Sequence, residues 1–221
     1  MTDFAELRER MVERQIAARG IGDPALLDAF RKVPREEFVS SEYGRQVYGD
    51  HPLPIAAGQT ISQPYIVALM IEAARIAPGD RVLEVGAGSG YAAAVISRVA
   101  QQVTAIERKP ELVAEARERL ERLGYSNVTI VEGDGTRGWP GGAPYDAILA
   151  AASGSHIPQP LIDQLAPGGR LVMPVGGRAW VQQLVKLTKL ADGRTEQENL
   201  GEVRFVPLIG EEGWSEGARQ D

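Results

Sequence analysis

The glycine loop that follows the run RVLEV (residues 81–85) constrains the fold more than any other feature of the chain. This run has the β-branched, apolar character of a buried strand, and the pattern of residues 91–100 predicts a helix. Between them the sequence reads GAGSG, and alternate glycines let the backbone approach a ligand beyond the carboxyl end of a parallel strand. The dinucleotide fingerprint is G-x-G-x-x-G, but Tyr91 occupies the place of its third glycine, which disfavours an NAD-dependent oxidoreductase.

Beyond residue 80, short β-branched runs alternate with helical patterns. This alternation predicts a parallel sheet with right-handed crossovers and helices on both faces. Two further strands, residues 180–190 and 203–208, follow without helices between them and flank a turn at Asp192-Gly193, so we expect them to be antiparallel. The fold class is therefore α/β, a Rossmann-like, doubly wound and mostly parallel sheet. The predicted strands of its parallel part are residues 81–85, 103–107, 128–131, 147–150 and 170–174, and the helices are residues 91–100, 110–123 and 158–165.

The first 79 residues form a helical N-terminal extension of the same domain. An amphipathic pattern predicts a helix over residues 3–19, and the cap signal Asp23-Pro24 predicts a second helix to residue 31. An apolar helix is predicted over residues 63–76. Residues 48–62 form a long irregular loop, and loops of this length inside compact domains are usually functional. The domain core spans residues 80–210, and residues 211–221 form a polar tail that we expect to fray at its end.

The amino-acid composition excludes several kinds of site and of binding partner. The chain has 221 residues, 24 Lys+Arg against 30 Asp+Glu for a net charge of −6, no Cys and only two His. Disulfides, thiolate metal sites and cysteine nucleophiles are excluded, and the acidic balance argues against binding to nucleic-acid phosphates. The N-terminus lacks the apolar stretch of a signal peptide, and no run is long enough to span a membrane, so we expect a cytoplasmic protein.

Acidic residues follow two successive strands of the predicted sheet. Glu107 ends the strand VTAIE, where a carboxylate can accept hydrogen bonds from both ribose hydroxyls of a nucleoside. Asp134, followed by Gly135, comes after the next strand, where an acceptor can meet an adenine amino group. Taken singly, Glu107 is equally well a solvated strand end and Asp134 a turn residue. Their order at consecutive strand ends favours one nucleoside site.

The glycine loop, preceded by Glu84, resembles the first motif of class I S-adenosylmethionine (SAM)-dependent methyltransferases. Longer segments, in order along nearly the whole chain, resemble the protein-L-isoaspartate O-methyltransferase family. The loop containing GQTISQP is the most specific of them. The segments are DHPLPI with GQTISQP (residues 50–64), LGYSNV (123–128), GDG with GWP (133–140), APYDAI (143–148), QLAPGGRLV (164–172) and VRFVPL (203–208). The run from Ala150 to Ser155 departs from the family pattern close to the expected acceptor.

The resemblance implies an enzyme that transfers the methyl group of SAM to the free α-carboxylate of L-isoaspartyl residues in damaged proteins. The ester would then close to a succinimide and reopen in part to aspartate. The resemblance implies no metal, and we expect a monomer that uses neither nucleic acid nor a membrane. It assigns the catalytic position to Ser62, whose hydroxyl would orient the acceptor carboxylate. The residues expected to bind SAM are Thr60, Ile61, Ser62, Glu84, Gly86, Gly88, Gly90, Glu107, Asp134 and Gly135.

Alternatives remain at this point. Ser62 precedes Gln63-Pro64 and, from local sequence alone, is more readily a helix N-cap. His51 is best interpreted as a surface residue, and Trp139 and Trp214 as packing residues. A class I methyltransferase with another acceptor and a non-catalytic SAM-binding module are the two competing functions.

Overall fold

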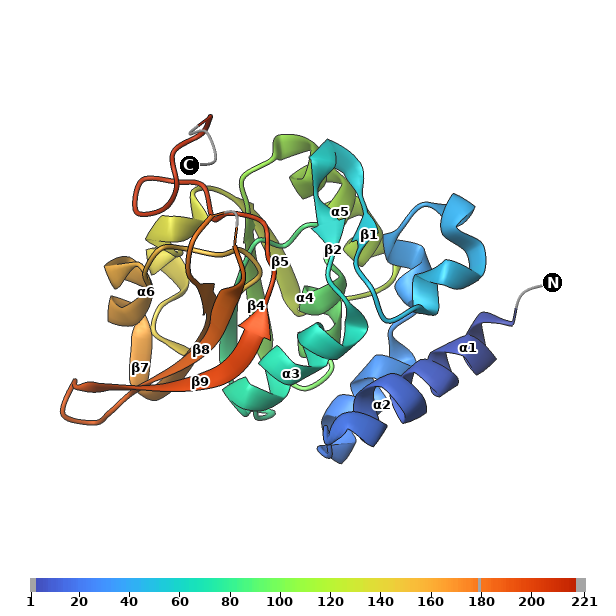
Figure 1. The fold of residues 1–221 in the computed structure, drawn as a ribbon, viewed down its shortest axis with the longest axis horizontal. Coiled ribbons are helices and arrows are strands. Elements are labelled where there is room, and N and C mark those ends of the chain that lie inside the picture. The colour runs from blue at the N-terminus through green and yellow to red at the C-terminus, as the bar shows by residue number, and fades with distance from the viewer. Residues whose placement is uncertain (1–2, 179, 218–221) are drawn as a thin grey trace.

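The computed structural model, which describes residues 3–178 and 180–217, has a seven-stranded sheet at its centre (Figure 1). The strand order is β5-β4-β3-β6-β7-β8-β9; neighbours from β5 to β7 pair in parallel, whereas β8 and β9 add to the edge as antiparallel strands. The predicted fold class is confirmed. The strands are β3 (Arg81–Val85), β4 (Gln102–Glu107), β5 (Val128–Glu132), β6 (Tyr145–Ala150), β7 (Leu165–Val175), β8 (Gln182–Lys189) and β9 (Thr195–Val203).

One strand prediction was wrong. The turn at Asp192-Gly193 is present, but its second strand is β9 and not residues 203–208. β9 is an edge strand in which only Leu200 is partly buried and only Val203 is buried, so its mostly polar sequence carries no apolar alternation. Residues 204–208 are extended but leave the sheet; their backbone pairs instead with Ser153, whose N–H donates to Val206 O and whose carbonyl accepts from Leu208 N.

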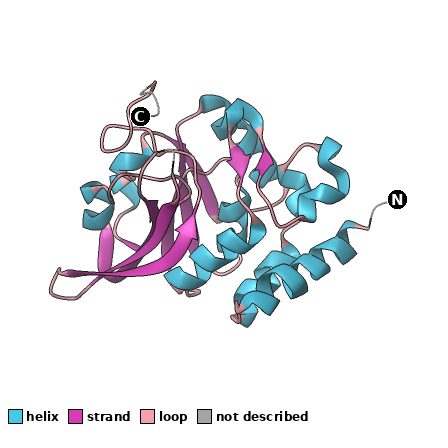
Figure 2. Cartoon of the chain, in the orientation of Figure 1, coloured by secondary structure: helices cyan, strands magenta, loops and turns pink. Residues whose placement is uncertain are grey.

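The helices divide unequally between the two faces of the sheet (Figure 2). Side chains alternate along each strand, so Val82 and Leu149 join a large cluster with the N-terminal helices, whereas Leu83 and Ile148 join a smaller cluster on the opposite face. The larger cluster contains residues from both the N-terminal extension and the sheet. The helices are α1 (Phe4–Met11), α2 (Pro24–Lys32), α3 (Pro64–Ala74), α4 (Tyr91–Ile96), α5 (Pro110–Arg122) and α6 (Gln159–Asp163).

Local sequence explains several helix ends. The Asp3 and Asp23 side chains accept from backbone N–H groups at the starts of α1 and α2, and Pro24 occupies the first turn of α2. The first predicted helix is helical throughout but changes to a π-turn over Val12–Ile16 and a 3-10 turn over Ala17–Arg19. Within the part of the chain that the structure describes, no helix is both long and apolar enough to cross a bilayer.

The loop of residues 48–62 contains more structure than its sequence predicts. A short hairpin joins β1 (Leu53–Pro54) to β2 (Thr60–Ile61), with Leu53 opposite Ile61. Its tip turns through Ala57, a non-glycine residue at φ 56°. The hairpin reaches back to the glycine loop, since a Cβ on Gly88 would lie 3.4 Å from Ile55 Cδ1.

Candidate active site

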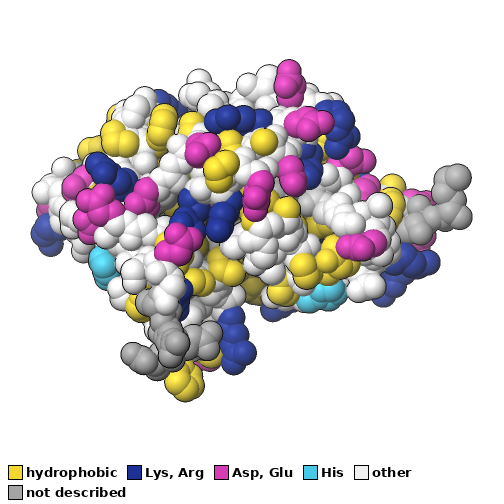
Figure 3. Space-filling model, turned by 90° about the horizontal axis from the view of Figure 1, so that it is seen from above, with side chains coloured by type: hydrophobic (Ala, Val, Ile, Leu, Met, Phe, Trp, Pro, Cys, Tyr) yellow, Lys and Arg dark blue, Asp and Glu magenta, His cyan; other side chains and the backbone are white. Residues whose placement is uncertain are grey.

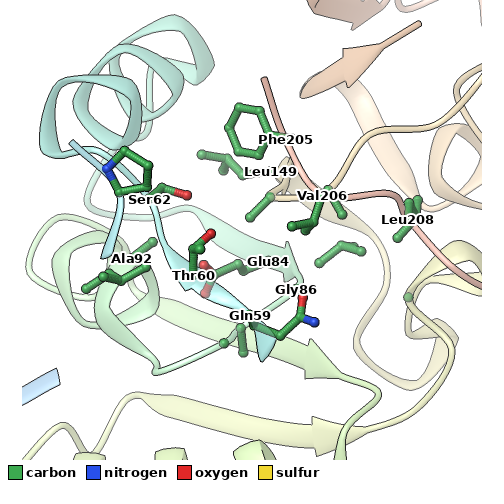
Figure 4. Close-up of a pocket in the computed structure, with 18 of the residues that line it drawn as sticks. Gln59, Thr60, Ser62, Glu84, Gly86, Ala92, Leu149, Phe205, Val206 and Leu208 are labelled. Atoms are coloured by element: carbon green, nitrogen blue, oxygen red, sulfur yellow. The ribbon is translucent and has the colours of Figure 1, made fainter. Parts of the chain in front are cut away.

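A cavity of about 1060 Å³ opens at the carboxyl ends of β3 and β4. Residues 58–63, which include the second strand of the hairpin, form one wall, and residues 202–209 form the opposite wall. Figure 4 shows Thr60 and Ser62 on the first side and Phe205 and Val206 on the second, with Glu84 close to Thr60. Because pockets for one drug-sized ligand hold roughly 300–1,000 Å³, this cavity has room for a nucleoside cofactor and part of an acceptor.

The glycine loop lies at the floor of the cavity. Gly86, Gly88 and Gly90 have φ values of 90°, 53° and 87°, a region that favours glycine, so the alternate glycines are required by the backbone itself. Gly86 and Gly88 line the cavity, and their contact with a cofactor stays a prediction. Gly90 does not line it; it caps α4, and a Cβ there would lie 3.2 Å from Leu120 Cδ1 of the neighbouring helix.

Glu107 lies at the end of β4 and is only 6% exposed, yet it lines the cavity. Backbone amides hold its carboxylate in place: Oε2 accepts from Gly88 N at 2.9 Å, and Oε1 accepts from Arg108 N at 2.8 Å and Lys109 N at 3.0 Å. A carboxylate has about four acceptor positions, so this arrangement orients the group and leaves capacity for hydroxyl donors.

Glu84, in β3, is 2% exposed and also lines the cavity. Its Oε2 has no hydrogen-bond partner among the described residues. Burial, together with the nearby charge of Glu107, raises the pKa of Glu84 to about 8. A buried carboxyl without a partner that faces a cavity is suited to a cationic ligand group, which would restore its ionised form.

The two residues expected near adenine differ in position. Gly135 lines the cavity, and a Cβ there would lie 2.5 Å from Val85 Cγ1. Asp134 lies outside the cavity wall, where its carboxylate accepts from Thr136 N at 2.9 Å, Thr136 Oγ1 at 2.7 Å and Glu211 N at 2.8 Å. Burial alone would raise the pKa of Asp134, but these hydrogen bonds and the charge of Arg137 lower it overall. Its contact with a nucleoside stays a prediction.

Ser62 follows the hairpin and lines the cavity together with Thr60 and Ile61. The N-cap of α3 is Gln63, and no side chain caps this helix, so the alternative that Ser62 is a helix cap is wrong. The Ser62 carbonyl accepts a hydrogen bond from Arg35 Nη2 at 2.8 Å. The Ser62 hydroxyl therefore does not cap the helix. The Ser62 backbone is held by the hydrogen bond from Arg35 to its carbonyl.

The opposite wall was missed as a functional element, because we expected residues 203–208 to be a sheet strand. The segment instead runs along the cavity and continues into the tail. Trp214 packs as predicted, with its indole N–H donating to Ser153 O at 3.0 Å. Farther on, Glu216 lines the cavity and pairs with Arg108 at 3.2 Å. The expected fraying of the tail concerns residues 218–221, which lie outside the described residues.

The remaining candidates lie apart from the cavity. His51 is exposed and its ring contacts Pro52 O, and Trp139 is 38% exposed. No group of three or more Asp, Glu, His or Cys side chains that could hold a metal occurs in residues 3–178 and 180–217. The residues that line the cavity include side chains of both charge signs. On the face of the molecule shown in Figure 3, both signs are interspersed with hydrophobic side chains.

Comparisons with known proteins agree along nearly the whole chain. The family model of protein-L-isoaspartate(D-aspartate) O-methyltransferases (PCMT) matches residues 6–213. Protein-L-isoaspartate O-methyltransferase 1 of Rhodopseudomonas palustris (strain HaA2) is 58% identical over 214 residues, which are 97% of this chain and 87% of the relative. Protein-L-isoaspartate O-methyltransferase of Methanoculleus marisnigri is 56% identical over 207 residues, 94% of this chain and 93% of the relative.

Solved structures show the same relationship. A protein-L-isoaspartate O-methyltransferase structure superposes with a TM-score of 0.85 at 33% identity, covering 93% of this chain and 67% of that chain. A candidate enzyme of the same kind from Plasmodium falciparum, in complex with S-adenosyl-L-homocysteine, gives a TM-score of 0.78 at 27% identity over 91% of this chain and 98% of that chain. The chain therefore belongs to the protein-L-isoaspartate(D-aspartate) O-methyltransferase family of SAM-dependent enzymes.

Proposed function

We propose that this chain methylates the free α-carboxylate of L-isoaspartyl residues in damaged proteins and peptides. The observation that carries the proposal is the single cavity that joins Glu84 and Glu107 on its floor to Ser62 on its wall. When bound, SAM supplies a methyl group on a cationic sulfur; a carboxylate oxygen forms the new bond to carbon as the carbon–sulfur bond breaks and its electron pair stays on sulfur. No proton has to move in that step.

The residues of the floor fit such a cofactor. Glu107 would accept from the ribose hydroxyls, and the unpartnered Oε2 of Glu84 would receive the ammonium group of the methionine moiety. Gly86 and Gly88 would allow close approach of the ligand. Thr60 and Ile61 would cover the methionine moiety from the hairpin, and Gly135 with Asp134 would lie toward the adenine.

Ser62 would act on the acceptor. Its hydroxyl would donate one hydrogen bond to the incoming carboxylate and align an oxygen with the methyl group, without becoming a nucleophile. Because the acceptor carboxylate has an ordinary pKa near 4 and is already ionised at pH 7, a general base is unnecessary. Orientation and exclusion of water then lower the barrier, and well-oriented reactants can gain roughly 7–11 kcal/mol.

The proposal also covers localisation, oligomeric state, partners and the roles of the two parts of the chain. The chain would work as a cytoplasmic monomer, without nucleic acid or membrane, with residues 1–79 supplying the acceptor loop and residues 80–210 the SAM site. The net charge of −6 and the mixed charge signs of the residues that line the cavity support the absence of a phosphate-binding face. Light scattering after gel filtration would test the monomer.

The deciding experiment supplies radiolabelled SAM with matched peptides that contain isoaspartate or normal aspartate. We expect base-labile methyl incorporation into the isoaspartyl peptide alone. Incorporation into neither peptide, with SAM binding intact, would instead support another acceptor or a SAM-binding module.

A further inference from the structure

Arg35 is a fully buried arginine behind the cavity, with 0% of its surface exposed. It begins the 3-10 turn Arg35–Phe38 that follows α2, and it does not itself line the cavity. Taking a guanidinium out of water is strongly unfavourable unless its charge is paired and its N–H groups are hydrogen-bonded. None of the residue roles proposed above involves the Arg35 side chain.

Arg35 holds both ends of the segment that carries the hairpin. Its Nε donates to Val47 O at 2.9 Å, just before the loop of residues 48–62, and its Nη2 donates to Ser62 O at 2.8 Å at the end of that loop. These two carbonyls are 15 positions apart in the sequence (62 − 47). The planar fork of a guanidinium can reach both at once, whereas a lysine ammonium lacks that geometry.

The charge of Arg35 is only partly compensated. Its Nη1 has no hydrogen-bond partner, and no carboxylate lies within ion-pair distance of it among the described residues. Partial compensation comes from the Tyr91 ring, whose centroid is 4.8 Å from Cζ and which itself lines the cavity. Burial lowers the pKa of Arg35, against the opposing influences of Tyr91, Tyr48 and Asp50. An anion bound nearby would relieve this deficit.

We propose that Arg35 is a positioning residue of the acceptor site, which fixes Ser62 from behind and supplies the buried positive charge that favours an acceptor carboxylate. The inference rests on the proposed function, because it requires that the acceptor be an anion bound at Ser62. Its charge would add to that of the basic side chains that line the cavity, Arg108, Lys109, Arg178 and Arg204, and so help a chain of net charge −6 to receive an anion. A charge in the protein interior is screened far less than one on the surface, so a single guanidinium can offset long-range repulsion.

The test compares Arg35→Met and Arg35→Lys with a matched arginine. Arg170 also donates to two backbone carbonyls, Ala74 O at 2.7 Å and Arg75 O at 2.8 Å, but it pairs with Asp80 and lies outside the cavity wall. For Arg35→Met we expect the KM of an isoaspartyl peptide to rise about 10- to 50-fold, with the Kd of SAM within about twofold of the unchanged chain. Arg35→Lys keeps the charge, so KM should rise less while kcat falls, because Ser62 is held less firmly. Arg170→Lys should lower the melting temperature and leave both kinetic constants unchanged.

Hydrogen exchange gives a readout that does not depend on activity. Amides of residues 48–62 should exchange faster in both Arg35 variants, and those of β3 and β4 should not. An unchanged peptide KM in Arg35→Met, an equal loss of SAM and peptide binding, or the same kinetic loss in Arg170→Lys would overturn the proposal. If Arg35→Met does not fold, the Arg35→Lys variant decides by itself: unchanged kcat and unchanged hydrogen exchange of residues 48–62 in that variant would overturn the proposal. If the unchanged chain fails to methylate the isoaspartyl peptide, the proposed function fails, and exchange still decides whether Arg35 holds the segment.

Discussion

On the cofactor side of the cavity, backbone amides hold a functional carboxylate, whereas on the acceptor side a buried side chain holds a functional backbone. Glu107 receives three N–H groups from the residues beside it and from the glycine loop. Ser62 depends on Arg35, which comes from a different element 27 positions earlier (62 − 35). The first arrangement is built into the ends of adjacent parallel strands, and the second exists only when the N-terminal extension packs on the sheet. The two sides should therefore respond differently to mutation.

Glu107→Ala should give the largest effect and confine it to the cofactor side. Hydrogen bonds to a charged acceptor contribute roughly 1.5–3 kcal/mol each, so loss of even one of those to the ribose should weaken SAM binding up to about 100-fold by calorimetry. The matched control is Glu132→Ala, because Glu132 is the register partner of Glu107 in β5 but is exposed and lies outside the cavity wall. Unchanged SAM affinity in Glu107→Ala would remove this residue from the site.

Ser62→Ala should give the next largest effect, on the acceptor side alone. Loss of one hydrogen bond to an ionised acceptor should lower kcat/KM for the isoaspartyl peptide roughly 10- to 100-fold. The Kd of SAM should stay within about twofold, and exposed Ser126→Ala should leave both constants unchanged. A collapse of SAM binding together with the melting temperature would mean that Ser62 is chiefly structural.

Glu84→Gln should separate affinity from stability. The folded chain keeps Glu84 protonated up to a pKa of about 8, against an ordinary value of 4.5, so folding stability falls as pH rises between these values and levels off above them. The melting temperature of Glu84→Gln, compared with that of the wild-type protein, should therefore be more favourable at pH 8 than at pH 5. Its affinity for SAM should fall about tenfold.

Calorimetry in buffers of different ionisation enthalpy offers a second measurement of Glu84. Binding of the SAM ammonium should ionise this carboxyl and release a proton at pH 7, and Glu84→Gln should abolish the release. A stability difference that does not change with pH would contradict the raised pKa.

Glu216→Gln should give the smallest effect. The pair with Arg108 is largely exposed on the Glu216 side, and surface ion pairs contribute about 0–1 kcal/mol. Dissociation of SAM, followed by stopped flow, should quicken less than about fivefold, and the difference should shrink as salt is raised. A tenfold or greater change would show that the tail controls access to the cofactor.

Prediction from sequence succeeded where local pattern and burial agree. β3 spans Arg81–Val85 as expected, because both of its faces are covered and its run is apolar and β-branched. Prediction failed for β9, because this mostly exposed edge strand carries no apolar alternation. It also failed for residues 204–208, because their apolar side chains line the cavity and do not belong to a strand of the sheet. An apolar segment is predicted to be buried, but its sequence does not show whether it packs in a sheet or lines a cavity.

The sequence by itself determined the α/β order, the glycine loop and the acidic strand ends, because strand–loop–helix units follow rules that act within about 30 residues. It also indicated Ser62, through a segment with a specific resemblance. Only the tertiary structure decided that Ser62 is not a helix cap, that residues 204–208 face it, and that Arg35 lies behind it. These facts depend on contacts between segments far apart in the chain, whose partners are set by the packing of the whole core.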